Sequence, residues 1–295
     1  MSVTLMGTMQ WLLPFPFLFA PWQKTVQKTA AQGTAIAAEL PEIRDRGYLI
    51  IAVKNNRAPL GFIDETGELN GFEIDIAHRL AEVLLGDSSA VRFVPTSNID
   101  RLNAVLEDRV DIAIAGITLT EPRRRIVSFS DPYYLDGAAL ITQSPDVQTL
   151  RDLRTSTIAL IDRSSTVSHV KYILPGAQLI GVSSYAEGRR LLASGRVDAF
   201  AGDVSALSGW NRESSGESSG ESGAASYRIL PNILSAEPLA IALPKGTQYD
   251  PLRTEINQAL RRWYAEGWLQ SRAAYWQLPA ETSSLVDTSV NSQPR

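Results

Sequence analysis

Between residues 48 and 276, short apolar runs alternate with segments in which apolar residues recur every three or four positions. The runs have the length of buried strands, and the periodic segments have the spacing of amphipathic helices. The runs are Tyr48–Val53, Leu60–Ile63, Val91–Pro95, Ile112–Ile114, Thr157–Ile161 and Gln178–Gly181. The periodic segments contain Ile76, Leu80 and Leu84, then Ile99, Leu102 and Leu106, and later Leu252, Ile256 and Trp263. This alternation predicts an α/β fold with right-handed crossovers.

One sequence element occurs twice, at residues 109–116 and 196–202. In each copy a predicted helix is followed by Arg-Val-Asp and then by a short strand that ends in Ala-Gly. The repeat predicts two lobes of similar topology, whose strand ends face each other across a cleft. Leu140–Thr142 and Ala236–Leu243 are apolar, extended segments that we expect to cross between the lobes. The predicted division is residues 40–139 for the first part of lobe 1, 140–236 for lobe 2, and 237–279 for the return to lobe 1 with C-terminal helices.

Three segments differ in composition from these lobes. Residues 1–39 are predicted to form a leader and a linker, and Trp11–Ala20 has the length of the apolar core of a signal segment. No Lys or Arg precedes that core, so a misassigned start or a loose apolar tail is the alternative. Residues 211–225 are rich in Ser, Gly and Glu and predict a flexible insertion in lobe 2. Residues 280–295 are polar and predict a disordered tail.

The composition excludes several classes of protein. The 295 residues carry a formal net charge of −4 and no long basic block, which argues against nucleic acid as a partner. The sequence contains no cysteine, which excludes disulfides, Cys-ligated zinc and a thiol nucleophile. With only two histidines, a His-rich metal site is excluded as well. We therefore expect neither a metal nor a cofactor.

The segment Asp111–Tyr134 carries the strongest candidate chemistry. Gly116 allows the backbone to turn after the strand, and Thr118, Thr120 and Arg123 follow on a loop that enters a helix. An arginine offers a planar fork of two donors, and a helix N-terminus adds free N–H groups, so this loop suits a carboxylate. The alternative is a basic surface loop that faces solvent.

The second copy of the repeat ends in an acid, Asp203, rather than in cations and hydroxyls. Opposite charges on the two walls of a cleft suit a zwitterion. Asp203 could instead cap the helix that follows it. Ser165 and Thr166 follow the strand Thr157–Ile161, and their hydroxyls can either cap a helix or bind a ligand.

Three ordered motifs resemble the extracellular solute-binding proteins of family 3, the polar amino-acid receptors of ABC importers. They are Gly71–Ile76 with Leu80, Ala81 and Leu84, then Thr120–Arg123 with Val127–Tyr134, and finally Arg196–Ala199 with Gly202 and Asp203. The resemblance implies the type II periplasmic-binding-protein fold, in which two α/β lobes are joined by two crossing segments. It also implies an amino-acid ligand, ABC transporter permease subunits as partners, a periplasmic location and a monomer.

The resemblance assigns roles to the candidate residues. Arg123 would bind the ligand α-carboxylate with help from Thr118, and the Gly116 backbone and Asp203 would bind the α-ammonium. Ser165 and Thr166 would add contacts from the second lobe. The chain departs from the family pattern at Arg163, where a glycine is usual, at Glu121–Pro122, whose order is reversed, and in the loop Lys54–Arg57, which lacks the usual aromatic cover.

The cations Lys54, Arg57 and Arg101 are expected near the pocket. The loop Val53–Asn56 and the segment Thr96–Arg101 look like those of the glutamate/aspartate-binding branch. We therefore predict a polar, acidic L-amino acid as the ligand, since a basic ligand would meet like charge. The alternative for each cation is a solvated surface residue.

Two other functions are compatible with the same fold. An enzyme like the cyclohexadienyl dehydratases, which act on prephenate or arogenate, needs a general acid in the cleft, for which Asp203 and Glu73 are the candidates. A receptor domain of a sensor is the second. No Ser–His, Cys–His or metal constellation accompanies the acids, so we predict a binding protein and not an enzyme.

Overall fold

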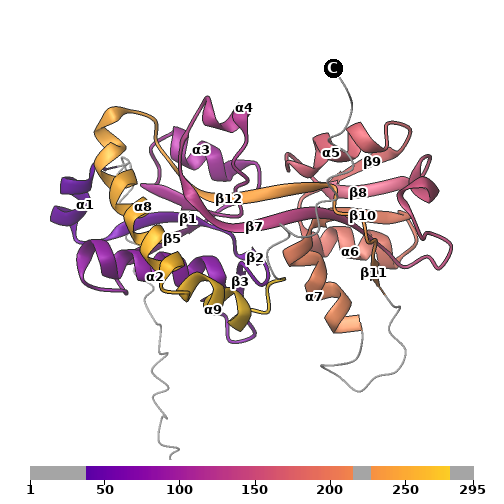
Figure 1. The fold of residues 1–295 in the computed structure, drawn as a ribbon, viewed down its shortest axis with the longest axis horizontal. Helices are drawn as coiled ribbons and strands as arrows, with labels where there is room; N and C mark the ends of the chain where they lie inside the picture. The colour runs from indigo at the N-terminus through magenta and orange to yellow at the C-terminus, as the bar shows by residue number, and fades with distance from the viewer. Residues whose placement is uncertain (1–37, 215–226, 280–295) are drawn as a thin grey trace, which may run out of the picture. The chain divides into compact units, whose positions relative to one another are not determined.

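The computed structural model describes residues 38–214 and 227–279, all of which belong to one compact unit. The predicted signal segment, most of the predicted insertion and the predicted tail lie outside the described residues. Figure 1 shows an α/β arrangement in which helices flank a sheet with strands of very different length.

Three parallel strands form the sheet of the first lobe. β1 (Leu49–Val53) lies between β5 (Val91–Pro95) and β6 (Ile112–Ile114). The crossovers contain α2 (Phe72–Leu85) and α3 (Asp100–Leu106). The other helices of this lobe are α1 (Leu40–Arg46), α4 (Glu121–Arg124), α8 (Asp250–Ala265) and α9 (Trp268–Tyr275). A separate three-stranded antiparallel sheet consists of β2 (Asn56–Arg57), β3 (Gly61–Ile63) and β4 (Leu69–Asn70).

The second lobe repeats the parallel arrangement. β8 (Thr157–Ile161) lies between β9 (Gln178–Val182) and β10 (Ala199–Asp203). The helices of this lobe are α5 (Thr166–Ile173), α6 (Tyr185–Ala193) and α7 (Val204–Ser214). Two short 3₁₀ helices, Leu150–Leu153 and Thr247–Tyr249, lie outside these units.

Two long antiparallel strands connect the lobes. β7 (Ser128–Thr142) and β12 (Ser235–Leu243) pair with each other from Ser235–Ala138 to Leu243–Ser128. β12 also pairs with β6, and β7 pairs with β10 and with the short β11 (Arg228–Ile229). All described strands except β2, β3 and β4 therefore form one sheet of order β5-β1-β6-β12-β7-β10-β8-β9, with β11 beside β7. The predicted lobe boundaries fall inside β7 and β12 and remain a prediction.

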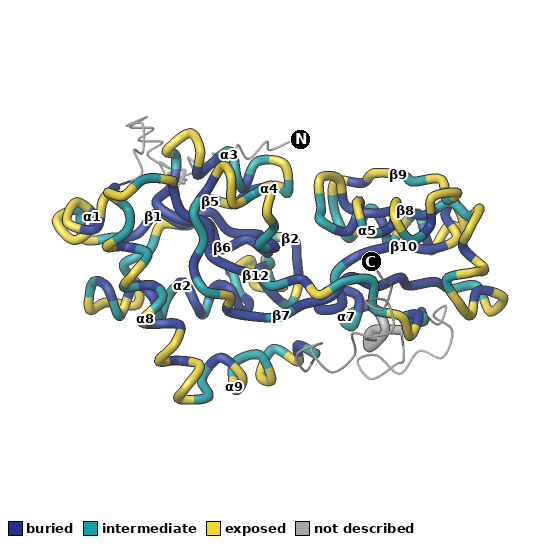
Figure 2. Tube along the Cα trace, turned by 45° about the horizontal axis from the view of Figure 1, so that its top comes forward, coloured by how far each residue is buried: buried dark blue, intermediate teal, exposed yellow. Residues whose placement is uncertain are grey.

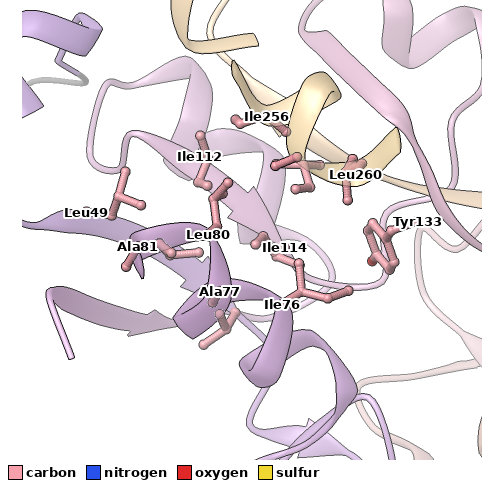
Figure 3. Close-up of a cluster of buried hydrophobic side chains, with 14 of the residues drawn as sticks. Leu49, Ile76, Ala77, Leu80, Ala81, Ile112, Ile114, Tyr133, Ile256 and Leu260 are labelled. Carbon is pink, nitrogen blue, oxygen red and sulfur yellow. The ribbon is translucent and has the colours of Figure 1, made fainter. Parts of the chain in front are cut away.

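Each lobe has its own hydrophobic clusters on both faces of its strands. In β1, Leu49, Ile51 and Val53 pack with α2 and α8, whereas Ile50 and Ala52 belong to a second cluster with α3. Figure 3 shows the first cluster between β1, β6 and these helices. Burial on both faces explains why these strands appear in the sequence as continuous apolar runs rather than as alternating ones. Figure 2 shows that β6, β7 and β10 are largely buried, whereas β9 and the outer turns are exposed.

The repeated Arg-Val-Asp element has a structural role in both lobes. The carboxylate of Asp111 accepts a hydrogen bond from the Ile50 N–H at 2.8 Å, and that of Asp198 accepts one from the Thr157 N–H at 2.8 Å. Each aspartate thereby fixes the beginning of the neighbouring parallel strand. The repeat places Ala115-Gly116 directly after β6 and Ala201-Gly202 in the last part of β10.

The predicted strands are confirmed, and those at Val91–Pro95 and Thr157–Ile161 have the predicted bounds. The predicted first residue of the Ser/Gly/Glu insertion is wrong. The composition predicts a flexible insertion from residue 211, but α7 continues to Ser214. The segment Trp210–Ser214 lacks Gly and Pro, so the helix can extend almost to the first glycine of the Ser/Gly/Glu run.

Candidate functional site

The candidate residues gather at the carboxyl ends of parallel strands from both lobes. Lys54 follows β1, the segment Ala115–Thr118 follows β6, Ser165 follows β8, and Asp203 ends β10. In open α/β sheets this edge is where ligands bind, because the strand-to-helix loops converge there. Several hydrogen bonds and ion pairs join groups of the first lobe to groups of the second, which brings the predicted residues into one site.

Arg57 and Asp203 form the clearest contact between the lobes. Arg57 Nη2 lies 2.8 Å from Asp203 Oδ2 and 3.4 Å from Asp136 Oδ2. Tyr185 donates its hydroxyl hydrogen to the same Asp203 oxygen. Burial alone would lower the pKa of Arg57, but the carboxylates of Asp203 and Asp136 raise it above its ordinary value. Arg57 is therefore a buried side chain that remains positively charged and pairs with Asp203 and Asp136, which we call the acidic side of the site.

Both the N–H and the carbonyl of Gly116 form hydrogen bonds with side chains of the site. Its N–H donates to Glu73 Oε1 at 2.7 Å, and its carbonyl accepts from Arg101 Nη1 at 2.6 Å and from Arg57 Nη1 at 3.2 Å. Its φ is +60°, and a Cβ at this position would lie 1.6 Å from Arg57 Nη1. Only glycine fits here. The carbonyl predicted to accept from a ligand ammonium already accepts from two guanidinium groups.

Lys54 and Arg101 are buried cations, exposed by only 4% and 2%. Lys54 Nζ donates to the Thr96 carbonyl at 3.2 Å, and Arg101 Nη1 donates to the carbonyls of Ala115 and Gly116. Burial and then the charge of Arg101 lower the pKa of Lys54 to about 8. Burial and then the charge of Arg123 lower the pKa of Arg101 to about 9. Both shifts indicate cations whose charge the surrounding carboxylates only partly compensate.

Arg123 and Thr118 lie together, as predicted. Arg123 Nη1 donates to the Thr118 carbonyl at 2.8 Å, and its Nη2 donates to the Arg163 carbonyl of the second lobe at 3.4 Å. Burial lowers the pKa of Arg123. The hydroxyls of Thr118 and Ser165 lie 3.0 Å apart, and both contact the same oxygen of Glu237.

The loop after β8 shows what replaces the usual glycine. Arg163 has a φ of +56°, so the backbone keeps the left-handed conformation that a glycine would adopt without cost. The next hydroxyls differ in role, since Ser165 binds Glu237 while the buried hydroxyl oxygens of Ser164 and Thr166 have no protein partner among the described residues. Buried polar atoms normally have partners, so Thr166 retains the capacity to bind a ligand.

Two alternatives from the sequence are wrong. Lys54, Arg57 and Arg101 are not solvated surface residues, because all three are buried. Asp203 does not cap α7, since its carboxylate accepts from Tyr185 and pairs with Arg57 instead. The Ser205 N–H in the first turn of α7 donates to the carboxylate of Asp136 at 3.1 Å.

Sequence reasoning missed four participants: Glu237, Asp136, Tyr185 and Ser235. Glu237 and Asp136 are acids inside the crossing strands, and both are fully buried. A charged residue in the apolar segment Ala236–Leu243 is a signal that could have identified Glu237, whereas Asp136 lies outside the predicted crossing segments. Tyr185 gave no such signal, because its position on α6 is also typical of a core residue.

A cavity of about 920 Å³ lies next to Arg57. Its lining includes Tyr185, Arg189 and Trp210 but none of Thr118, Arg123 or Ser165. It therefore shares one wall with the candidate site and is distinct from the carboxylate-binding side. No group of three metal-ligating side chains occurs within residues 38–214 and 227–279.

A model of the bacterial extracellular solute-binding proteins, family 3, matches residues 49–279. The chain belongs to this family. The matched region contains all three motifs that carried the resemblance, and the family match confirms the predicted fold class. None of the helices in the described part of this family 3 protein is long and apolar enough to cross a membrane.

Known relatives of this family 3 protein are amino-acid-binding proteins. A glutamine-binding protein of Geobacillus stearothermophilus is 29% identical over 230 residues, which cover 76% of this chain and 84% of the relative. A glutamate-binding protein of Corynebacterium efficiens is 27% identical over 239 residues, covering 77% of each chain. An ancestral amino acid-binding protein, a precursor of cyclohexadienyl dehydratase, superposes with a TM-score of 0.71 at 26% identity, covering 80% of this chain and 98% of the other.

Proposed function

We propose that this protein is the extracytoplasmic substrate-binding component of an ABC importer and that it captures an acidic L-amino acid between its two lobes. The observation that supports an acidic ligand is a set of three cations, Lys54, Arg101 and Arg123. None of the ion pairs among the described residues involves any of them. Buried charges are normally paired, so this site favours a ligand that supplies negative charge.

The cations divide into two groups that match a dicarboxylate. Arg123, with Thr118, Ser165 and Thr166, is the proposed receptor for the α-carboxylate. Lys54 and Arg101 form the second group, because both donate to backbone carbonyls of the loops that follow β5 and β6, whereas Arg123 donates to Thr118 and to the second lobe. We assign these two to the side-chain carboxylate of glutamate or aspartate.

The α-ammonium is assigned to the remaining oxygen of Asp203. Arg57 and Tyr185 both contact Oδ2 of this carboxylate. Oδ1 has no hydrogen bond to another described residue, so it is available to an ammonium group of the ligand. The Gly116 carbonyl plays a smaller part than expected, because Arg57 and Arg101 already bind it.

The proposal is tested by a thermal-shift screen of the twenty amino acids, followed by calorimetry on purified variants. Glutamate or aspartate should give the largest rise in melting temperature, because a ligand that binds only the native state stabilises it. Arg123→Ala and Asp203→Asn should each weaken binding by roughly 100-fold or more, the usual result of truncating a buried charge contact.

Arg125→Ala is the matched control. Arg125 belongs to the same run of three arginines but is exposed, and its side chain makes no hydrogen bond or ion pair with a described residue, so its removal should leave the affinity unchanged. Equal affinities of the wild type, Arg123→Ala and Asp203→Asn would contradict the site. A larger thermal shift with glutamine or arginine than with glutamate would contradict the acidic ligand.

The same site argues for binding rather than turnover. A dehydratase needs a group that donates a proton to the leaving hydroxyl. Asp203, the candidate, instead faces two donors, Arg57 and Tyr185, and Glu73 faces the Gly116 N–H and the Tyr133 hydroxyl. We expect no product from prephenate or arogenate, and measurable turnover of either would decide for the enzyme. Permease subunits are the proposed partners, and we expect a monomer in solution.

A further inference from the structure

The guanidinium of Arg57 is a positive charge supplied by the protein next to the carboxylates of Asp203 and Asp136. Its guanidinium contacts Asp203 at 2.8 Å, Asp136 at 3.4 Å and the Gly116 carbonyl at 3.2 Å. The side chain is only 4% exposed, and its partners come from β10, β7 and the loop after β6. Three parts of the chain therefore converge on one planar group.

The two carboxylates need this cation. Asp136 is fully buried, and burial followed by the charge of Asp203 raises its pKa to about 7, whereas Arg57 lowers it. Two carboxylates that share a buried space without a cation are costly, since each disfavours the ionised form of the other. The Gly137 and Ser205 N–H groups and the Ser205 hydroxyl also donate to Asp136, but they carry no charge.

We propose that Arg57 determines specificity by excluding cationic amino acids from the site. Its guanidinium bridges Asp203 Oδ2 and Asp136 Oδ2, so a guanidinium or ammonium side chain of a ligand cannot pair with these two oxygens. The nearby cations Lys54, Arg101 and Arg123 add repulsion toward a basic side chain of a ligand. The inference rests on the proposed function only in placing the ligand between the lobes.

The substitution Arg57→Ala should allow the protein to bind cationic ligands that the wild type excludes. The substitution removes the guanidinium and leaves two carboxylates and the Gly116 carbonyl around the space that it filled. Free guanidinium ion has the charge and the planar donors to replace it. L-arginine and guanidinium chloride at low millimolar concentration are therefore the probes, with sodium chloride at equal ionic strength as the blank.

The expected results differ sharply between variants. Wild type should show no binding of arginine and no stabilisation by guanidinium. Arg57→Ala should bind arginine at least tenfold more tightly than wild type. Guanidinium at roughly ten times its dissociation constant should raise the melting temperature of this variant by about 3 °C. Lys54→Ala is the matched control, because it also removes a buried cation but one with no carboxylate partner, so guanidinium should not stabilise it.

Each outcome decides for or against the inference. Arginine binding by wild type as tight as that of glutamate would overturn it, and so would an equal response of Arg57→Ala and Lys54→Ala to guanidinium. If Arg57→Ala unfolds in plain buffer, recovery of a cooperative melt on adding guanidinium supports the inference. Failure of that recovery, together with no gain of arginine binding in Arg57→Met, refutes it. Glutamate binding by wild type is measured separately, so failure of the proposed function remains distinguishable.

Discussion

At the scale of single residues, the site is defined by how its charges are compensated. Arg57 has two carboxylate partners and a pKa above its ordinary value, whereas Lys54 and Arg101 donate only to carbonyls and have lowered pKa values. The sequence alone does not show which buried cations are paired with carboxylates. In the structure Arg57 is paired, whereas the charges of Lys54 and Arg101 could be neutralised by a ligand.

The lowered pKa of Lys54 predicts that ligand binding depends on pH. Its pKa of about 8 means that it is charged at pH 7 and loses its proton as the pH rises toward 9. The affinity for an acidic ligand should therefore fall above pH 8, by up to about tenfold per pH unit. Calorimetry between pH 7 and 9.5 measures this decline. Lys54→Met should bind more weakly at pH 7 and show a flatter profile, while Lys171→Met, at an exposed lysine, should follow the wild type.

The stability of the free protein should change with pH in the opposite sense. The folded pKa of Lys54 is about 8, below the ordinary value of 10.5 for an unfolded chain. The cost of burying the charged lysine is therefore complete below pH 8 and disappears as the pH rises toward 10.5, because the unfolded chain then binds more protons. The difference in unfolding free energy between wild type and Lys54→Met isolates this contribution. A difference that does not change with pH would contradict the assignment.

At the scale of elements, the sequence predicted most strands and helices because their apolar patterns are strong. The five residues of β1 are all buried, and the buried residues of α8 are those that its helical spacing predicts, Leu252, Ile256, Ala259, Leu260 and Trp263. The end of α7 was missed because residues 211–214 were grouped by composition with the Ser/Gly/Glu run, although the first glycine of that run, Gly216, lies beyond Ser214. Local pattern thus predicts elements well and their ends less well.

The sequence predicted which residues belong to the site better than it predicted which of them contact each other. The family motifs identified Arg123, Thr118 and Asp203, and the structure brings them to one sheet edge. The pairing of Arg57 with Asp203 was not predictable, because it joins residues 146 positions apart that interact only when the two lobes approach. Asp136 and Glu237 were not predicted because the apolar pattern that identifies a buried strand does not show whether a charged residue within that strand is also buried.

A glycine in α6 provides a test of packing between elements. Gly188 is buried, and a Cβ there would lie 2.1 Å from the Phe200 ring of β10. Gly188→Ala should lower the unfolding free energy by about 1–3 kcal/mol through overpacking. A Cβ on Gly209 in α7 meets nothing within 4 Å, so Gly209→Ala should raise the unfolding free energy by about 0.5–1 kcal/mol, as alanine does in a helix. Urea unfolding measures both, and equal effects of the two substitutions would contradict the packing.

At the scale of the whole molecule, the contacts between the lobes include groups on the two strands that connect them. The crossing strands β7 and β12 each contribute one fully buried acid, Asp136 and Glu237. Each acid lies where a contact between the lobes is made, Asp136 beside Arg57 and Asp203, and Glu237 beside Thr118 and Ser165. The strands that connect the lobes therefore also supply acceptors to the site, and we infer that the proposed closure would act through these acceptors.

Glu237 gives the sharpest test of this link. One of its oxygens accepts from Thr118 at 2.6 Å and from Ser165, and the other accepts from Ser235 at 3.0 Å. Glu237→Gln keeps the volume but offers one carbonyl oxygen in place of two carboxylate oxygens, so Thr118 and Ser165 lose a charged acceptor. We expect ligand affinity to fall by about 10-fold or more, mainly through faster dissociation in stopped-flow experiments, as charged hydrogen bonds contribute about 1.5–3 kcal/mol.

Ser235→Ala separates closure from simple loss of a buried hydrogen bond. It removes the contact to the second oxygen of Glu237 and leaves the oxygen that Thr118 and Ser165 share. Both variants should lose some thermal stability, because each leaves a buried polar group with fewer partners. Only Glu237→Gln should accelerate dissociation of the ligand. Equal dissociation rates for the two variants would mean that Glu237 stabilises β12 without controlling closure, since a purely structural role predicts changes in melting temperature and none in the rate of release.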